Sequence, residues 1–244
     1  MIQKYAKPPI IEAVIQFKLT RTLYPAQLER VSRLARKRYG EVAPMTNVDV
    51  QIDADNGLVT ARRLPTGFRL GIQEDVLILQ PSDFIVSRLA PYTGWDEFFE
   101  RAKEDWATLE KVAGTRSISR VGLRYINRLD VPRNGARPLD YSRYCRVEIT
   151  IPTVYAGTLV GLSTRYESAF PQKDDLAVVV NSAIIESPLF DHHSILLDID
   201  VIQQNRVPEN MQDVWAMLGE MRAFKNEIFE SAVTDDARVL FRGE

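Results

Sequence analysis

The chain has 244 residues, of which 45% are hydrophobic and 26% are charged. This composition is typical of a globular protein, and the length suits one large domain or two packed halves. The formal net charge of -2 gives no reason to expect bulk attraction to nucleic acid or to an acidic membrane. Cys145 is the single cysteine, which excludes a scaffold stapled by internal disulfides.

The pattern of apolar residues favours a cytoplasmic protein. Residues 1–17 contain lysines but no apolar core of signal-peptide length and no small-residue cleavage site. Nowhere do about 18 apolar residues run together, so we expect no membrane span.

Charge is distributed unevenly along the chain. Residues 1–69 contain twelve Lys or Arg and six Asp or Glu, a balance of +6. Residues 171–236 contain four Lys or Arg and thirteen Asp or Glu, a balance of -9. Solvated surfaces would explain both, and so would electrostatic pairing between halves or between subunits packed head to tail.

The first elements are a strand, a helix and a meander of strands. Residues 10–19 are rich in β-branched side chains, which predicts a strand. A helix is expected from Pro25, which suits a first helical position, to Gly40, which suits a helix end. Short apolar segments separated by turn residues then predict antiparallel strands. These segments are 48–52, 58–64, 68–72, 76–80 and 84–89.

Two long helices punctuate the rest of the chain. Trp95, Phe98, Ala102 and Trp106 lie at helical spacing, with Thr93 as the expected N-cap and a stop at Gly114. Asn210 is the expected N-cap of the other long helix, and residues 234–236 suggest one further short helical turn. Strands are expected at 118–131, 145–151, 161–169, 175–184 and 194–203.

Runs of strands followed by helices predict an α+β fold. We expect a large, mostly antiparallel sheet packed by two long helices, and two similar halves at 1–132 and 133–244 would fit this order. The halves would pack as one globular unit. No internal sequence repeat is strong enough to establish a duplication.

No recognisable catalytic motif is present. His192 and His193 are adjacent, so on a strand they would point to opposite faces, and we predict no metal site there. The sequence contains neither a nucleophile elbow nor a phosphate-binding loop, and we predict no cofactor. Cys145 lies in an expected strand, where a buried, unreactive thiol is favoured over a nucleophile.

One strand mixes polar and apolar residues on both of its sides. In residues 120–130, Arg124 and Asn127 fall on opposite sides, so burial of the strand would require partners for at least one of them. An arginine there suits an internal ion pair, or a fork that binds a carboxylate or phosphate. Arg165 is a weaker candidate of the same type. Arg124, Asn127 and Arg165 are therefore the candidate ligand-binding residues.

A basic cluster is the remaining sequence feature that bears on binding. It consists of Arg30, Arg33, Arg36, Lys37, Arg38, Arg62, Arg63 and Arg69. These residues could form one patch, but no known nucleic-acid-binding motif accompanies them. A solvated surface is favoured, and nucleic acid is not the expected partner.

Three stretches together resemble a known group of proteins. They are residues 7–17 with the pattern Pro-Pro-Ile-x-Glu-Ala, the helix that contains Trp95, Phe99 and Trp106, and the strand with Gly-Leu-Arg-Tyr-Ile-Asn. In these the chain resembles a sporadically distributed family of uncharacterised prokaryotic proteins, over nearly its whole length. The resemblance implies an intracellular accessory role, in a mobile or defence-associated gene neighbourhood. It carries no catalytic residues.

Three functions remain in competition. A non-catalytic binding protein, with a protein partner or self-association, is favoured by the missing motifs and the charge asymmetry. It predicts a groove between sheet and helix or a sizeable oligomer interface. An enzyme acting on a small anionic molecule predicts that Arg124, Asn127 and Arg165 converge in one pocket. A nucleic-acid-binding regulator predicts binding that depends steeply on salt.

Overall fold

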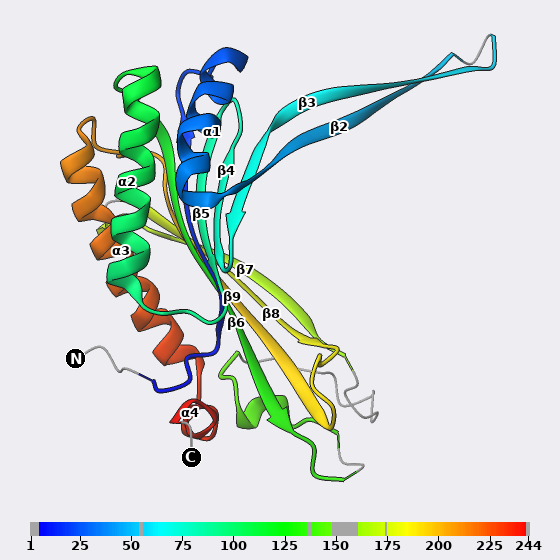
Figure 1. The fold of residues 1–244 in the computed structure, drawn as a ribbon. Coiled ribbons are helices and arrows are strands. Elements are labelled where there is room, and N and C mark those ends of the chain that lie inside the picture. Colours follow the sequence, from blue (N-terminus) through cyan, green and yellow to red (C-terminus); the bar gives the residue numbers. More distant parts are fainter. Residues whose placement is uncertain (1–4, 54–55, 136–137, 148–160, 174, 243–244) are drawn as a thin grey trace. The chain divides into compact units, whose positions relative to one another are not determined.

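The computed structural model of the chain describes residues 5–53, 56–135, 138–147, 161–173 and 175–242 (Figure 1). The expected α+β class is confirmed. The α-helices are α1 (Pro25–Tyr39), α2 (Trp95–Ala113), α3 (Met211–Ala232) and α4 (Asp235–Arg242), and the short 3-10 helices are η1 (Tyr141–Arg143) and η2 (Pro171–Lys173). The strands are β1 (Ile10–Leu19), β2 (Glu41–Asp53), β3 (Leu58–Ile72), β4 (Asp75–Leu79), β5 (Asp83–Leu89), β6 (Ile118–Pro132), β7 (Ser163–Phe170), β8 (Leu176–Ile185) and β9 (His192–Gln203).

The strands form a nine-stranded sheet in the order β2-β3-β4-β5-β1-β6-β9-β8-β7. The pairs β2–β3, β3–β4, β4–β5, β6–β9, β9–β8 and β8–β7 are all antiparallel. Short turns connect several of them directly, which antiparallel pairing allows and parallel pairing does not. No helix in the described part of the chain has the length and hydropathy of a membrane span.

The chain divides into two compact units that are interleaved in sequence. Unit 1 comprises Met1–Val14, Ala90–Tyr92 and Val121–Glu244, and unit 2 comprises Ile15–Leu89 and Thr93–Arg120. Unit 1 thus takes segments from both sides of residue 132, where the sequence suggested a boundary between halves.

The core of unit 2 lies between its strands and the helices α1 and α2. Strand β1 contributes Phe17 and strand β5 contributes Phe84, and both rings are fully buried. Trp106 of α2 meets both rings edge-on, with centroid distances of 5.1 and 5.3 Å. The apolar stripe predicted for this helix therefore packs on the sheet, where each buried aromatic contributes roughly 2–3 kcal/mol.

The predicted helix ends in unit 2 are mostly confirmed. Pro25 is the first residue of α1, and Gly40 and Gly114 follow the last turns of α1 and α2 with φ of 71°. The N-cap prediction for α2 was wrong, because the helix begins one residue later than expected. Gly94 takes the cap position, and no side chain caps the helix there.

In unit 1 the long helix α3 packs on the sheet through its apolar stripe. Val214, Leu218 and Met221 are buried, together with the central residues of β6, β8 and β9. The predicted cap is confirmed, since the side chain of Asn210 accepts a hydrogen bond from the Asp213 amide at 2.9 Å. The expected last turn is helix α4, which Thr234 caps through the Ala237 amide.

Several strand boundaries differ from those predicted. Residues 58–64 and 68–72 form one strand, β3, and β9 begins at His192 rather than at residue 194. Of the strand expected at 145–151, Cys145 makes only an isolated bridge to Val233, residues 146–147 lie outside any strand, and 148–151 lie outside the described residues. A local register shift near Met45 and Thr46 marks the place where β3 bends past β4.

Close packing at this bend requires a glycine. Gly67 has φ of 147°, and a Cβ at this position would lie 2.0 Å from the carbonyl oxygen of Leu79 on β4. Any side chain would therefore clash with backbone, and L-residues rarely adopt this φ.

Beyond this bend, β2 and β3 pair with no other strand in the described part of the chain. Strand β4 pairs only with Phe68–Ile72 of β3, whereas β2 and β3 pair along their whole lengths. Residues 46–53 and 58–65 consequently form a two-stranded ribbon, which we call the arm. Figure 1 shows the arm leaving the helices of unit 2.

Candidate functional site

Arg124 lies on the face of β6 away from α3 and forms an ion pair with β9. Its Nε and Nη2 atoms donate to the two carboxylate oxygens of Asp198, each at 2.8 Å. Asn181 of β8 donates to the same carboxylate at 3.0 Å. Asp198 is buried, and its hydrogen bonds raise the pKa of Arg124. The guanidinium fork is thus engaged by an acid of the same chain.

Asn127 occupies the opposite face of the same strand. Its side chain is buried, and the amide donates to the carbonyl oxygens of Leu197 at 2.9 Å and of Tyr125 at 3.3 Å. These bonds satisfy an amide among apolar side chains, which is the structural requirement for burying it. Nothing in this geometry directs Asn127 toward a ligand.

Arg165 lies on the edge strand β7 and is exposed. It pairs with Glu167 of its own strand at 3.2 Å. Arg165 stands opposite Asn181 in the ladder, so it shares a face with Arg124. Asn127 is on the other face. The structure therefore does not bring the three candidate residues together in one site.

Cys145 and His192 are the other residues that the sequence suggested for nucleophilic or metal chemistry. Cys145 is buried as predicted, and burial raises the pKa of its thiol to about 11, so the thiolate is rare at neutral pH. The His192 ring contacts the carbonyl oxygen of Phe190 at 2.7 Å. Within the described ranges, no group of three or more His, Cys, Asp or Glu side chains is placed to hold a metal ion.

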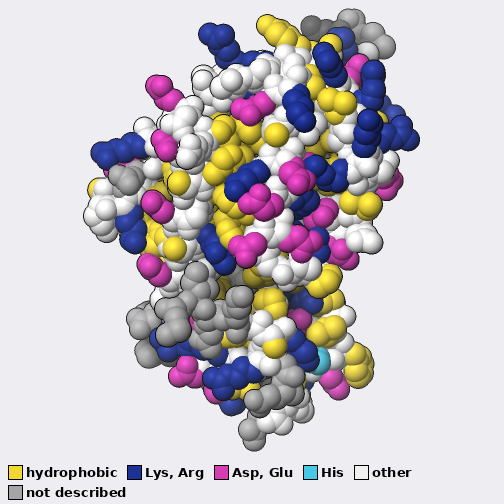
Figure 2. Space-filling view, turned by 60° about the vertical axis from the view of Figure 1, so that its left-hand side comes forward, with side chains coloured by type: hydrophobic (Ala, Val, Ile, Leu, Met, Phe, Trp, Pro, Cys, Tyr) yellow, Lys and Arg dark blue, Asp and Glu magenta, His cyan; other side chains and the backbone are white. Residues whose placement is uncertain are grey.

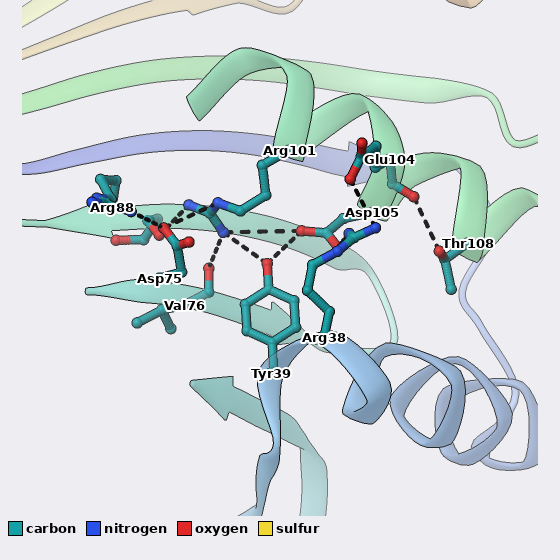
Figure 3. A network of polar contacts seen from close by, with 10 residues as sticks. Arg38, Tyr39, Asp75, Val76, Arg88, Arg101, Glu104, Asp105 and Thr108 are labelled. Carbon is teal, nitrogen blue, oxygen red and sulfur yellow. Dashed lines mark hydrogen bonds and ion pairs between the residues drawn. The ribbon is translucent and has the colours of Figure 1, made fainter. Parts of the chain in front are cut away.

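Unit 2 contains a buried polar network that the sequence analysis did not identify (Figure 3). Arg101 of α2 donates to the Tyr39 hydroxyl and to the carbonyl oxygen of Ser87, each at 2.7 Å. Its Nε atom lies 3.1 Å from Asp75, which also pairs with Arg88 at 2.9 Å. The guanidinium thereby joins α2 to α1, β4 and β5.

Asp105, one turn beyond Arg101, completes this network. Burial raises the pKa of its carboxyl group, against the hydrogen bonds from Tyr39 and Arg38 and the charge of Arg101. The Tyr39 hydroxyl accepts from Arg101 and donates to Asp105, and burial raises its pKa. Apart from the Nε atom of Arg88, which is buried without a hydrogen-bond partner among the described residues, the charged groups of this cluster are paired, so we interpret it as a clamp between two helices and the sheet.

A buried amine is the unusual group in unit 1. Lys225 of α3 is 5% exposed, and its Nζ lies 3.9 Å from the centre of the Tyr125 ring. Burial lowers the pKa of Lys225 to about 7, Arg222 lowers it further and Glu230 opposes this. The Tyr125 hydroxyl in turn bonds the Tyr92 hydroxyl at 2.9 Å. A cation over an aromatic face substitutes here for a carboxylate partner.

A groove runs along one side of α3 in unit 1. Its volume is about 530 Å³, and it lies between α3, the start of β8 and the end of β9. Its apolar lining includes Leu176, Met221 and Phe224, which are buried, and Met217, which is partly exposed. Asp213 and Glu220 line it from α3, and Lys173 and Arg206 line it from outside that helix. The lining thus combines apolar side chains with charges of both signs.

The arm of unit 2 is amphipathic. The pairs Val48–Arg63 and Val50–Ala61 place these side chains on one face together with Val59. The other face carries one apolar side chain, Leu64, among the polar Asn47, Asp49, Thr60 and Arg62. Val48, Val50 and Val59 are 59%, 52% and 64% exposed. We call the valine-bearing side the apolar arm face. A two-stranded ribbon is marginally stable by itself in water, and this one also exposes an apolar face.

The basic cluster expected from the sequence is divided in the structure. Arg62 and Arg63 lie on opposite faces of the arm, and Arg38 is paired with Glu104 and Asp105. What remains together is the outer face of α1, formed by Arg30, Arg33, Leu34 and Lys37. Figure 2 shows Lys and Arg side chains concentrated in the upper part of the face that it draws.

Some of these features had signals in the sequence. Arg101 and Asp105 fall on the apolar stripe of α2, and Lys225 falls one turn after Met221 on the stripe of α3. Charged residues at such positions indicate burial with partners.

No family model and no curated protein matches the chain.

Proposed function

We propose that this protein is a non-catalytic protein-interaction protein, and that its arm binds a partner chain. The observation that carries this proposal is the apolar arm face, whose three valines are each more than half exposed. A ribbon that leaves apolar side chains and two strand edges in water is costly unless another chain covers them.

The arm also defines the chemistry of its partner. Arg63 stands beside Val48 on the apolar arm face, so a complementary surface would be an apolar strand or strip with a carboxylate near one end. The free edges of β2 and β3 can add backbone hydrogen bonds to a partner strand. Apolar contacts would then supply affinity and the Arg63 contact would supply register.

The wider setting belongs to the same proposal. We place the protein in the cytoplasm of a prokaryote, in an accessory role, because the chain resembles the uncharacterised family described above. The alternative of an enzyme acting on an anionic small molecule required Arg124, Asn127 and Arg165 together. Their positions on two faces of the sheet do not support it.

Paired arm variants test this proposal. The triple change Val48→Thr, Val50→Thr and Val59→Thr keeps β-branched side chains, and so keeps strand propensity, while it removes apolar contact area. Tagged wild type and variant are purified from the native host at endogenous level, and co-purifying proteins are identified by mass spectrometry. We expect a stoichiometric partner with the wild type that the triple variant loses.

A control variant on the other face of the arm makes the result specific. Asn47→Ser with Thr60→Ser changes exposed side chains on the polar face, and the partner should be retained. The partner is then purified, and its affinity for each form is measured directly. Equal binding to the wild type and to the triple variant would show that the apolar arm face is not the binding surface.

A further inference from the structure

Two helices of this chain carry matching patterns of opposite charge. On the outer face of α1, Arg30, Leu34 and Lys37 follow one another at i, i+4 and i+7. On the groove side of α3, Asp213, Met217 and Glu220 have the same spacing. Seven residues of helix span about 10 Å, so the two charges on each helix are equally far apart. Each pattern places an apolar side chain between its charges.

Both patterns lie on outward-facing surfaces of the chain. Arg30, Arg33 and Lys37 are exposed, and Leu34 is 39% exposed. Asp213 and Glu220 are exposed as well. Among the described residues, none of these five charged side chains forms an ion pair.

The groove beside α3 is suited to an incoming apolar side chain. Met217 is the partly exposed apolar residue of its lining, beside the buried Met221 and Phe224, and the volume of about 530 Å³ can admit a side chain from a docked helix. The two cations of the lining are already engaged, because Lys173 pairs with Glu227 and Arg206 pairs with Asp175. The groove is therefore open to a cationic helix with a central apolar residue.

We propose that the outer face of α1 in one copy docks into the α3 groove of a second copy. Leu34 enters the groove over Met217, while Arg30 and Lys37 pair with Asp213 and Glu220. The surfaces are different on the two copies, so the contact is head to tail and generates a ring or a filament. This arrangement explains the opposite charges of residues 1–69 and 171–236. It does not depend on the arm.

Complementary charge variants test the contact. Variant A carries Arg30→Glu and Lys37→Glu, and variant B carries the neutral changes Asp213→Asn and Glu220→Gln, so that the two altered surfaces do not attract one another; Asn at 213 retains a polar acceptor for Asn210. Molar mass is measured by sedimentation over a range of protein concentrations. We expect the wild type to assemble at low salt and to dissociate at 1 M salt, where charges are screened within about 3 Å.

Mixing the variants gives the sharpest result. Each variant alone should be monomeric, with its self-affinity reduced at least about tenfold. An equimolar mixture should form a 1:1 dimer and nothing larger, because A retains an intact α3 groove and B an intact α1 face. The reversal Lys111→Glu on the exposed side of α2 is the matched control and should assemble like the wild type.

Other results would overturn the inference. The inference is wrong if the wild type is monomeric at every concentration in low salt. It is also wrong if variants A and B each assemble like the wild type, or if their mixture stays monomeric. If the arm triple variant abolishes assembly, the contact between copies is at the arm instead. If the wild type is monomeric and variant A loses binding to a short duplex DNA, the α1 face serves nucleic acid.

Discussion

The buried amine of Lys225 makes a prediction about stability and pH. Lys225 is almost completely buried in unit 1 and lies over the Tyr125 ring, and no carboxylate of the described residues is paired with it. Lys225→Met replaces the amine by an apolar side chain of similar length. We expect this variant to unfold at higher urea concentration than the wild type at neutral pH.

The magnitude follows from the pKa of the amine. A fall from 10.5 to about 7 corresponds to roughly 4–5 kcal/mol, since one pKa unit is 1.36 kcal/mol. At pH 7 the unfolded chain carries this charge in water, so nearly all of this free energy, about 4 kcal/mol, opposes folding.

The pH dependence has a definite sign. Between pH 7 and 10.5 the unfolded chain still binds the proton on Lys225, whereas the folded chain has released it. Wild-type stability therefore rises with pH in this window, by up to about 1.4 kcal/mol per pH unit from this group. Below pH 7 both states bind the proton, so the cost is present in full and no longer changes.

Urea unfolding of wild type and Lys225→Met at pH 6, 7, 8 and 9 measures this directly. The advantage of the variant should be constant from pH 6 to 7 and should shrink by about 2 kcal/mol by pH 9. Lys111→Met, at an exposed position of α2, should show no such change. Wild-type and Lys225→Met stabilities that stay parallel across this range would refute a lowered pKa at Lys225.

Three further predictions concern stability and use the same assay. Asp105→Ala removes the acceptor of the Tyr39 and Arg38 hydrogen bonds and should cost about 3–5 kcal/mol, because Tyr39 and Arg101 then stay buried without it. Glu104→Gln at the exposed end of the same cluster should change stability by less than about 0.5 kcal/mol. Gly67→Ala should cost more than about 2 kcal/mol because its Cβ meets the Leu79 carbonyl, while Gly219→Ala on the exposed side of α3 should gain about 0.5–1 kcal/mol. Arg124→Met should cost about 2 kcal/mol, because it leaves Asp198 buried without its partner. The double variant Arg124→Met with Asp198→Leu should recover most of that loss. A double variant that is no more stable than Arg124→Met would contradict this account.

Local patterns predicted the elements of this fold well. The helix ends at Pro25, Gly40 and Gly114 and the cap at Asn210 depend on residues adjacent in sequence, and the structure confirms them. The cap of α2 was predicted wrongly at Thr93. Thr93 lies one position before the true N-cap, Gly94, and α2 begins at Trp95.

Contacts between distant residues explain what the patterns missed. Residues 58–72 were predicted as two strands because Pro65 and Gly67 interrupt the alternation, whereas the structure has one strand, β3. Gly67 is required within it because the backbone of β4 lies too close for any side chain. Arg101 and Asp105 lie on an apolar helix stripe, and only the fold brings Tyr39, Asp75 and the carbonyl of Ser87 within their reach.

The candidate ligand residues illustrate the same limit. Alternation along β6 correctly separated Arg124 from Asn127, because side-chain direction has a period of two in any strand. Which acid meets Arg124 depends on the register between β6 and β9, and that register places Asp198 within hydrogen-bonding distance. Spacing within one strand contains no information about its neighbour.

The sequence by itself determined the α+β class, the order of most elements, most helix ends and the absence of familiar catalytic motifs, because these depend on residues within about ten positions of one another. The tertiary structure decided which surfaces remain uncovered. Whether Val48, Val50 and Val59 form a core or an exposed arm depends on the length of β4, which pairs with only the last five residues of β3. The pairing of strands thus determines what is left for a partner.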